Sequence, residues 1–260
     1  MNGRLEVAMR HDRVSTIHGE VGTLSRDAVY QTIFSRRDIR SQFTKQHIPD
    51  EVLARVLYAA HHAPSVGFSQ PWDFILIREE DIKRRIHASF KKANEESTSL
   101  FDAEKQERYR QFKLEGITES PVNICVTYEK ERFGPVVVGR TIDPLMGPFS
   151  CVCAVQNLWL AARAEGLGVG WVSIIHEDDV KEILGIPPSL MLIAYLCIGY
   201  VTHFPAKPEL ESVGWLPRVP LSSLVHCNTW GGRISEAWQT LYTSIQNHAG
   251  FPAEDGSDGK

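Results

Sequence analysis

Apolar residues recur along this chain with two spacings, and the spacings predict where its helices and strands lie. Helical spacing begins after Ser25, which we expect to cap a short amphipathic helix that leads into residues 36–40. It resumes at Pro49, a favourable first-turn residue, and ends at Ala63, because a residue before proline avoids the helical region. The sequence therefore predicts two helices before the first strand.

Further along the chain, strands alternate with helices. Four apolar segments predict β-strands, at residues 74–77, 122–128, 169–175 and 190–200. Charged, helix-favouring residues from Glu79 to about Lys113 separate the first two strands, and a short helix over 178–184 separates the last two. Residues 149–165 are apolar nearly all round, which is typical of a helix at the centre of a core, and Gly166 is placed to end this helix. Since no internal repeat is visible, we predict an α+β fold.

Length and composition are those of an ordinary globular protein. The chain has 260 residues, of which 43% are hydrophobic and 23% charged, so it can bury a sizeable core. We expect an N-terminal extension over residues 1–24, one domain over residues 25–247 and a polar C-terminal tail over residues 248–260. The formal net charge of -4 gives no reason to expect nucleic acid or an anionic membrane as a partner.

The cysteines and the N-terminal residues indicate a compartment. The five cysteines are odd in number and form no Cys-x-x-Cys pair, which fits a reducing compartment and gives a zinc site little support. Charged residues interrupt the N-terminal segment, so we expect no signal peptide, and no segment reaches the roughly 20 apolar residues that cross a bilayer. We therefore predict a cytoplasmic protein that binds no metal.

The segment Arg36-Arg37-Asp38-Ile39-Arg40 is the first candidate for chemistry. Three guanidinium groups within five residues can hold a phosphate and other anionic oxygens through paired hydrogen bonds. One carboxylate stands among them, which a site built only for anions would avoid. The alternative explanation is a run of charges in solvent.

Residues 65–70 form the second candidate, between a predicted helix end and a predicted strand. Ser65 offers a hydroxyl, Gly67 permits close approach of a ligand to the backbone, and Gln70 offers an amide donor and acceptor. A flat heteroaromatic ring with alternating donors and acceptors would suit this set. The alternative is a plain loop that joins a helix to a strand.

Other polar and glycine-rich features have plain structural explanations. The glycines within residues 166–170 follow a helix and precede a strand, unlike a dinucleotide-binding fingerprint, so capping and tight packing explain them. Ser173 lies inside a predicted strand, where a core hydroxyl is expected, and the acidic residues 177–179 suit the first turn of a helix. Arg218 precedes a predicted terminal helix, where it could reach a phosphate or remain in solvent.

Taken together, these segments resemble the FMN-dependent nitroreductase superfamily. The resemblance is carried by the double arginine after the first helix, the Pro-Ser…Gln-Pro loop, the glycines before a late strand and the arginine ahead of a terminal helix. More narrowly, the chain resembles the 5,6-dimethylbenzimidazole synthase family, also called the BluB family, over about residues 25–232. The segments of closer similarity are residues 36–40, 61–72, 113–117, 139–141 and 153–173.

This resemblance implies an architecture and an activity. The fold would have a central mixed sheet flanked by helices, in an intertwined homodimer that binds the flavin at the subunit interface. The enzyme would consume reduced FMN and dioxygen and fragment the flavin to 5,6-dimethylbenzimidazole, the lower ligand of vitamin B12. Because the chain has no dinucleotide fingerprint, a separate NAD(P)H flavin reductase would supply the reduced FMN.

The resemblance also implies roles for individual residues. Those expected to contact the flavin are Arg36, Arg37, Asp38, Ile39, Arg40, Ser65, Val66, Gly67, Gln70, Leu114, Ser173 and Arg218. Asp38 and Ser173 match the two polar residues associated with flavin destruction: the carboxylate would move protons as ring bonds break, and the hydroxyl would orient the flavin or its oxygen adduct. Two alternatives stay open, namely a conventional FMN-dependent reductase of nitro compounds, quinones or halogenated phenols, and a flavin carrier without catalysis.

Overall fold

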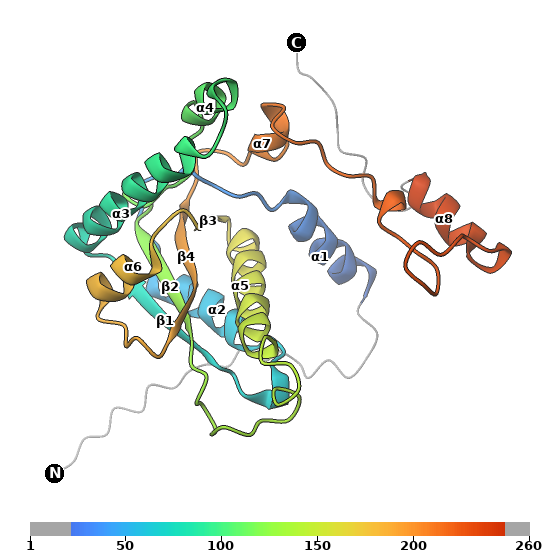
Figure 1. Ribbon diagram of the computed structural model, residues 1–260, viewed down its shortest axis with the longest axis horizontal. Helices are drawn as coiled ribbons and strands as arrows, with labels where there is room; N and C mark the ends of the chain where they lie inside the picture. Colours follow the sequence, from blue (N-terminus) through green and yellow to red (C-terminus); the bar gives the residue numbers. More distant parts are fainter. Residues whose placement is uncertain (1–21, 248–260) are drawn as a thin grey trace. The chain divides into compact units, whose positions relative to one another are not determined.

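The computed structural model describes residues 22–247 and divides the chain into two compact units (Figure 1). The first unit ends at Ala206 and the second begins at Lys207. The first contains the sheet and the longer helices, and the second contains short helical segments. Most of the expected N-terminal extension and the whole expected C-terminal tail lie outside the described residues.

A four-stranded sheet with the order β1-β2-β4-β3 forms the centre of the first unit. Its strands are β1 (Trp72–Ile77), β2 (Val122–Tyr128), β3 (Leu167–Val172) and β4 (Met191–Tyr200). Neighbouring strands are antiparallel, and within residues 22–247 the parallel pairing is an isolated bridge between Asp38 and Val169 at the β3 edge. The expected mixed sheet is thus antiparallel apart from this bridge, because long helical connections can return the chain in either direction.

Helices cover both faces of this sheet. The helices of the first unit are α1 (Thr23–Ser35), α2 (Asp50–His61), α3 (Glu80–Ser99), α4 (Ala103–Arg110), α5 (Met146–Ala164) and α6 (Glu177–Leu184), of which α2, α3, α5 and α6 cover the sheet. Side chains of α2 and α5 pack with Ile124 and Val126 on one face of β2, while α3 and α6 pack with Cys125 on the other. Because successive side chains of a strand alternate between faces, β2 is buried along its whole length.

Two helical regions differ most from the sequence prediction. The N-cap of α1 is Gly22 instead of Ser25, and α1 has no buried residue. The charged run that begins at Glu79 is divided into α3 and α4. The division has a local cause, because the Asp102 carboxylate accepts a hydrogen bond from the backbone N–H of Lys105 at 2.9 Å and so caps a new helix.

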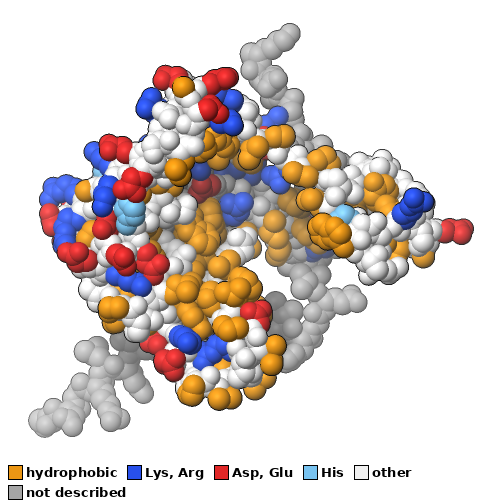
Figure 2. Space-filling view, viewed as in Figure 1, with side chains coloured by type: hydrophobic (Ala, Val, Ile, Leu, Met, Phe, Trp, Pro, Cys, Tyr) orange, Lys and Arg blue, Asp and Glu red, His pale blue; other side chains and the backbone are white. Residues whose placement is uncertain are grey.

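Helix α5 is exposed along part of its surface, although its apolar sequence predicted a central position. Leu158 and Ala162 are fully buried, but Phe149 is 49% exposed and Val152 is 42% exposed. Figure 2 shows hydrophobic side chains gathered over α5 and the loop before it. We call this exposed apolar set the α5 patch, and its members are Val136, Val138, Ile142, Leu145, Met146, Phe149 and Val152.

The second unit has little regular structure of its own. It contains α7 (Glu209–Ser212), 3-10 helices at Leu221–Ser223 and Glu236–Trp238, and α8 (Gln239–Gln246). No residue between 207 and 247 is buried. The terminal helix expected directly after Arg218 is only a 3-10 turn, because Pro220 holds the residue before it in an extended conformation and α8 begins later.

Three further observations concern the described residues as a set. None of their helices combines the length and apolar sequence needed to span a bilayer. Between residues 22 and 247, no group of three or more His, Cys, Asp or Glu side chains is arranged to hold a metal ion. The five cysteines are free thiols.

Candidate active site

Helix α5 connects the two candidate segments. Near its N-terminus, the Ser150 hydroxyl accepts a hydrogen bond from the backbone N–H of Val66 at 3.0 Å. Near its C-terminus, the Trp159 indole N–H donates to the backbone carbonyl of Arg37 at 3.2 Å. Since an α-helix rises about 1.5 Å per residue, these two contacts are about 14 Å apart along the helix axis. The two candidate segments therefore meet opposite ends of one helix.

Two glycines of β3 make room for the arginine segment at the sheet edge. The backbone N–H of Ile39 donates to the carbonyl of Val169 at 3.0 Å. A Cβ atom on Gly170 would lie 2.0 Å from the Ile39 carbonyl oxygen, and one on Gly168 would lie 2.8 Å from Ile39 Cγ1. Besides packing, these glycines therefore allow the backbone of residues 38 and 39 to pair with the strand, a role that the sequence did not indicate.

Arg36 and Arg37 have different partners within the first unit. The Arg36 guanidinium carbon lies 4.8 Å from the centre of the Trp159 ring, within cation–π range. Arg37 Nη1 donates to the carbonyls of Phe34 at 2.6 Å and Arg36 at 2.8 Å, and Nη2 donates to the carbonyl of Ala206. For Arg37 to hold a ligand phosphate, as the resemblance implies, it would have to exchange some of these backbone bonds.

Asp38 is held between Arg40 and the backbone of β3. Its Oδ2 accepts a hydrogen bond from Arg40 Nη2 at 2.9 Å, and its Oδ1 accepts one from the backbone N–H of Trp171 at 3.1 Å. The side chain of Asp38 is 34% exposed and that of Arg40 is 13% exposed. Burial raises the pKa of the Asp38 carboxyl above its ordinary value, while Arg40, the Trp171 N–H and Arg36 oppose this rise. The carboxylate is thus fixed in orientation yet reachable from solvent.

The second candidate loop is tightly folded and contains backbone strain. Ser65 Oγ accepts a hydrogen bond from the backbone N–H of Gln70 at 3.0 Å, across a 3-10 helix at Val66–Phe68. Gly67, Phe68 and Gln70 have φ angles of 54°, 52° and 36°, in a region that side chains rarely adopt. Strained residues of this kind gather at ligand sites, where the surrounding structure must hold them in place.

Residues 132–140 support this loop from outside. Arg132 Nη1 donates to the carbonyls of Gln70 and Trp72, each at 3.1 Å. A Cβ atom on Gly67 would lie 2.9 Å from the carbonyl oxygen of Val138, so the glycine is required by close packing as well as by its φ angle. Arg132 gives no signal in the sequence, because its partners are backbone atoms 62 and 60 residues away in the chain.

The turn that contains Leu114 lies against the arginine segment. A Cβ atom on Gly116 would lie 2.7 Å from the carbonyl oxygen of Arg40, and the half-buried Leu114 packs against the α3–α6 side of the core. Glu115, only 3% exposed, accepts a hydrogen bond from the backbone N–H of Ile117 at 2.7 Å. The burial of Glu115 could not be predicted, since one Glu among many charged residues gives no signal in the sequence.

Ser173 lies outside the strand in which the sequence placed it, whereas Arg218 is in solvent, one of its two predicted alternatives. Strand β3 ends at Val172, so Ser173 follows the strand and is exposed instead of being a core hydroxyl. The reason is that the pairing with β4 stops at Val172, where the chain leaves the sheet toward α6. Ser173 is nevertheless close in sequence to Trp171, whose N–H binds Asp38. Arg218 is an exposed residue of the second unit.

The acidic residues at the start of α6 are structural, as predicted. They occupy the first turn of the helix, where its dipole favours negative charge. Asp179 accepts a hydrogen bond from Ser89 Oγ at 2.8 Å, and Glu177 pairs with Lys181 at 2.8 Å. These contacts connect α6 to α3 and stabilise its first turn.

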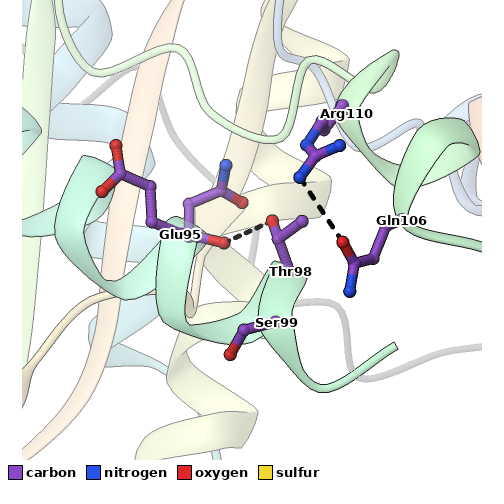
Figure 3. Close-up of a pocket in the computed structure, with 6 residues that line it drawn as sticks. Glu95, Thr98, Ser99, Gln106 and Arg110 are labelled. Carbon is purple, nitrogen blue, oxygen red and sulfur yellow. Dashed lines mark hydrogen bonds between the residues drawn. The ribbon is translucent and has the colours of Figure 1, made fainter. Parts of the chain in front are cut away.

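A hollow between α3 and α4 lies apart from both candidate segments (Figure 3). The close-up shows Thr98, Gln106 and Arg110 around it, with a hydrogen bond of 3.4 Å from Arg110 Nη2 to Gln106 Oε1. None of the residues predicted to contact the flavin lines this hollow. We therefore place the candidate active site at the β3 edge and the loop beside α5.

Comparison with known proteins identifies the family. The model of the Nitroreductase family matches residues 33–200. The 5,6-dimethylbenzimidazole synthase of Rhodospirillum rubrum is 39% identical over 194 residues, which are 75% of this chain and 90% of that protein. The 5,6-dimethylbenzimidazole synthase of Rhodobacter capsulatus is 33% identical over 195 residues, which are 75% of this chain and 94% of that protein.

Solved structures share the fold. A crystal structure of oxidized iodotyrosine deiodinase bound to FMN and 3-iodo-L-tyrosine superposes with a TM-score of 0.62 at 25% sequence identity, covering 77% of this chain and 99% of that one. The residues that the family model matches, 33–200, include the sheet and the arginine segment described above. The chain belongs to the nitroreductase family and, within it, to the family of the 5,6-dimethylbenzimidazole synthases.

Proposed function

We propose that this protein is a 5,6-dimethylbenzimidazole synthase, which consumes reduced FMN and dioxygen and fragments the flavin to release 5,6-dimethylbenzimidazole. The observation that carries the proposal is the position of Asp38. Its carboxylate is fixed by Arg40 and the Trp171 N–H beside two further arginines, and it remains partly exposed. A site that only bound an anionic flavin would gain nothing from a carboxylate there, whereas a reaction that moves protons would.

The residues around Asp38 suit an anionic flavin. Arg36 supplies positive charge for the phosphate and for the oxygens of the flavin, and guanidinium groups bind such oxygens through paired hydrogen bonds. The loop at residues 65–70 supplies strained backbone, a glycine and the Ser65 hydroxyl, which suit the edge of a flat ring. Leu114 and Val66 would add apolar contacts, and Arg218 a further cation. The side chain of Ile39 is fully buried in the core, so Ile39 would support the site from behind.

Within this proposal, Asp38 accepts and returns protons at the flavin as ring bonds break. General acid–base catalysis by a positioned carboxylate contributes about 10²–10⁴-fold to a rate. Ser173, which follows β3 in the sequence just after Trp171, would orient the flavin by hydrogen bonding. The flavin is therefore a substrate, and we infer that a separate NAD(P)H flavin reductase supplies its reduced form. The cytoplasmic location predicted from the sequence stays a prediction.

We also propose that the active enzyme is a homodimer with a flavin at each subunit interface. Two observations support it. The arginine segment and the loop at 65–70 meet α5 about 14 Å apart, and at a subunit interface one flavin would draw on the arginine segment of one subunit and the loop of the other. The α5 patch and the second unit, in which no residue between 207 and 247 is buried, also expose apolar surface that a second copy would cover.

The first test is product formation. Purified protein is mixed with chemically reduced FMN in air, and the small molecules are identified by mass spectrometry. We expect one 5,6-dimethylbenzimidazole for each flavin lost. Flavin that is regenerated over many cycles with an electron acceptor would instead identify a conventional reductase, and flavin that is bound without any turnover would identify a carrier.

Variants then test the residues. Asp38→Ala and Ser173→Ala should bind FMN but lose product formation by about 10²-fold or more, since each removes a group that acts on the bound flavin. Asp81→Asn is the matched control, because Asp81 is an exposed carboxylate of α3 that pairs only locally with Arg84. Full product formation by Asp38→Ala would exclude the proton-transfer role, and loss of product by Asp81→Asn would invalidate the assay.

A further inference from the structure

The carboxylate of Asp38 is bound at both oxygens by groups of its own chain. Arg40 Nη2 donates to Oδ2 at 2.9 Å, and the Trp171 N–H donates to Oδ1 at 3.1 Å. Hydrogen bonds to an ionised carboxylate are about twice as strong as bonds between neutral groups, and two of them fix the orientation of the carboxylate. The carboxylate plane is therefore set before any ligand arrives.

Arg40 is itself fixed by its surroundings, so it can fix the orientation of the Asp38 carboxylate. Its backbone N–H donates to Gln42 Oε1 at 3.2 Å, and the Gln42 carbonyl accepts from the Thr202 N–H at 2.9 Å. The Arg40 carbonyl lies against Gly116, where a Cβ atom would approach to 2.7 Å. Its side chain is only 13% exposed. Both the backbone and the side chain of Arg40 are thus packed against the protein, whereas a surface arginine that binds a phosphate has an exposed guanidinium group.

The charges that face Asp38 make Arg40 its principal cationic partner. Arg36, from the same segment, has a weaker effect on the pKa of Asp38 than Arg40. On the β3 side, the group that faces Asp38 is the uncharged Trp171 N–H. On the β4 side it is the buried thiol of Cys197, and the charge of Asp38 contributes to raising the pKa of that thiol. Burial pushes the pKa of Asp38 up, and Arg40 is the strongest group opposing that rise.

We propose that Arg40 is a positioning residue for Asp38, which fixes the direction and the ionised state of the carboxylate for the reaction. The sequence resemblance had placed Arg40 among the flavin contacts alone. The inference rests on the proposed function, since it gives Arg40 a task in the proton transfer assigned to Asp38. The β3 backbone at Gly170 and Trp171 completes the support, because only a residue without a Cβ lets the segment lie this close.

The test compares Arg40→Gln, Arg40→Lys and Arg36→Gln in the full-length enzyme, with thermal melting to verify that each variant is folded. Arg40→Gln should bind oxidised FMN within about threefold of wild type, yet form product at least about tenfold more slowly. The acid limb of its pH–rate profile should move to higher pH, because losing the cation raises the pKa of Asp38 further. Arg40→Lys should restore part of the rate and of the profile.

Arg36→Gln provides the comparison within the same segment. It should weaken FMN binding and move the pH profile less than Arg40→Gln does. In the double variant Asp38→Asn, Arg40→Gln, product formation should equal that of Asp38→Asn alone, because both changes act on one carboxylate. Fully additive losses in the double variant would overturn the proposal. So would an Arg40→Gln variant whose pH profile is unchanged and whose weaker FMN binding accounts for its whole loss of rate.

A measurement without turnover separates this inference from the proposed function. The carboxyl signal of Asp38 can be followed by NMR in protein labelled with ¹³C-aspartate, and Asp38→Asn identifies the signal. The pKa of Asp38 should be higher in Arg40→Gln than in wild type, whether or not the protein forms dimethylbenzimidazole. An unchanged pKa would overturn the role of Arg40 even if the enzyme proves to be a synthase.

Discussion

Gly170 shows how much a single residue can decide in this site. Its missing Cβ allows the carbonyl of Ile39 to approach β3, and the same approach brings Asp38 to the N–H of Trp171. The nearby Gly166 differs, because it has a φ of 77° and nothing within 4 Å of an added Cβ. One glycine is needed for space and the other for backbone conformation.

Replacing Gly170 should therefore uncouple Asp38 from the sheet. In Gly170→Ala the new methyl group would meet the Ile39 carbonyl, so we expect a loss of about 1–3 kcal/mol in the free energy of unfolding, and weaker product formation. Urea unfolding and the product assay measure the two effects. Gly166→Ala is the control, since its strain should cost stability while product formation by the folded enzyme stays close to wild type. Equal loss of activity in both variants would contradict the role of Gly170.

At the scale of elements, α5 connects the parts of the candidate site. The Ser150 hydroxyl, on a side chain that is 4% exposed, accepts the Val66 N–H and donates to the Met146 carbonyl at 2.6 Å. Its hydroxyl thus attaches the start of the strained loop to the first turns of the helix. The indole of Trp159 makes the corresponding contact with the arginine segment at the other end.

Removing the Ser150 hydroxyl should loosen the loop without unfolding the helix. Ser150→Ala leaves the Val66 N–H without its acceptor, which costs about 1–3 kcal/mol where such a group stays away from water. We expect weaker FMN binding, measured by fluorescence quenching, and faster hydrogen exchange at Val66. Ser99→Ala on α3 is the control, because the Ser99 hydroxyl is exposed and bonds only to Glu96. Unchanged exchange at Val66 would show that the Ser150 hydroxyl does not hold the loop.

At the scale of the whole molecule, exposed apolar surface is the main feature that one chain does not explain. The α5 patch includes Phe149 at 49% and Ile142 at 92% exposed, and α1 has no buried residue. Large exposed apolar surfaces on soluble proteins mark interaction sites. The proposed homodimer would cover them and would also bring together the two groups of flavin contacts.

A charge placed on the α5 patch should therefore separate the subunits. We expect Phe149→Asp to sediment as a monomer in analytical ultracentrifugation and to lose FMN binding, because each flavin site would lack half of its contacts. Leu100→Asp is the matched control, since Leu100 is 85% exposed at the end of α3, outside the patch. A monomeric wild-type protein that binds FMN would refute the dimer, and a Phe149→Asp dimer would place the interface elsewhere.

The limits of prediction differ among these scales. The strand at residues 122–128 was predicted with its boundaries, because a continuous apolar run leaves few alternatives. The helix near residues 149–165 was predicted too, but its exposed face was not, because an apolar side chain looks the same in a core and in an interface. Asp38 could be chosen by its chemistry, whereas Arg132, Glu115 and Ser150 could not, since their partners are distant in the sequence.

The sequence by itself determined the elements, the α+β class and the residue types available for chemistry, because periodicity and residue chemistry are local properties. It also carried the family resemblance. Only the tertiary structure decided that Asp38 pairs with Arg40 and the Trp171 N–H, that Gly170 makes this possible, and that the two candidate segments lie at opposite ends of α5. The physical reason is that hydrogen-bond partners and close backbone approaches depend on how distant segments pack, which no local pattern encodes.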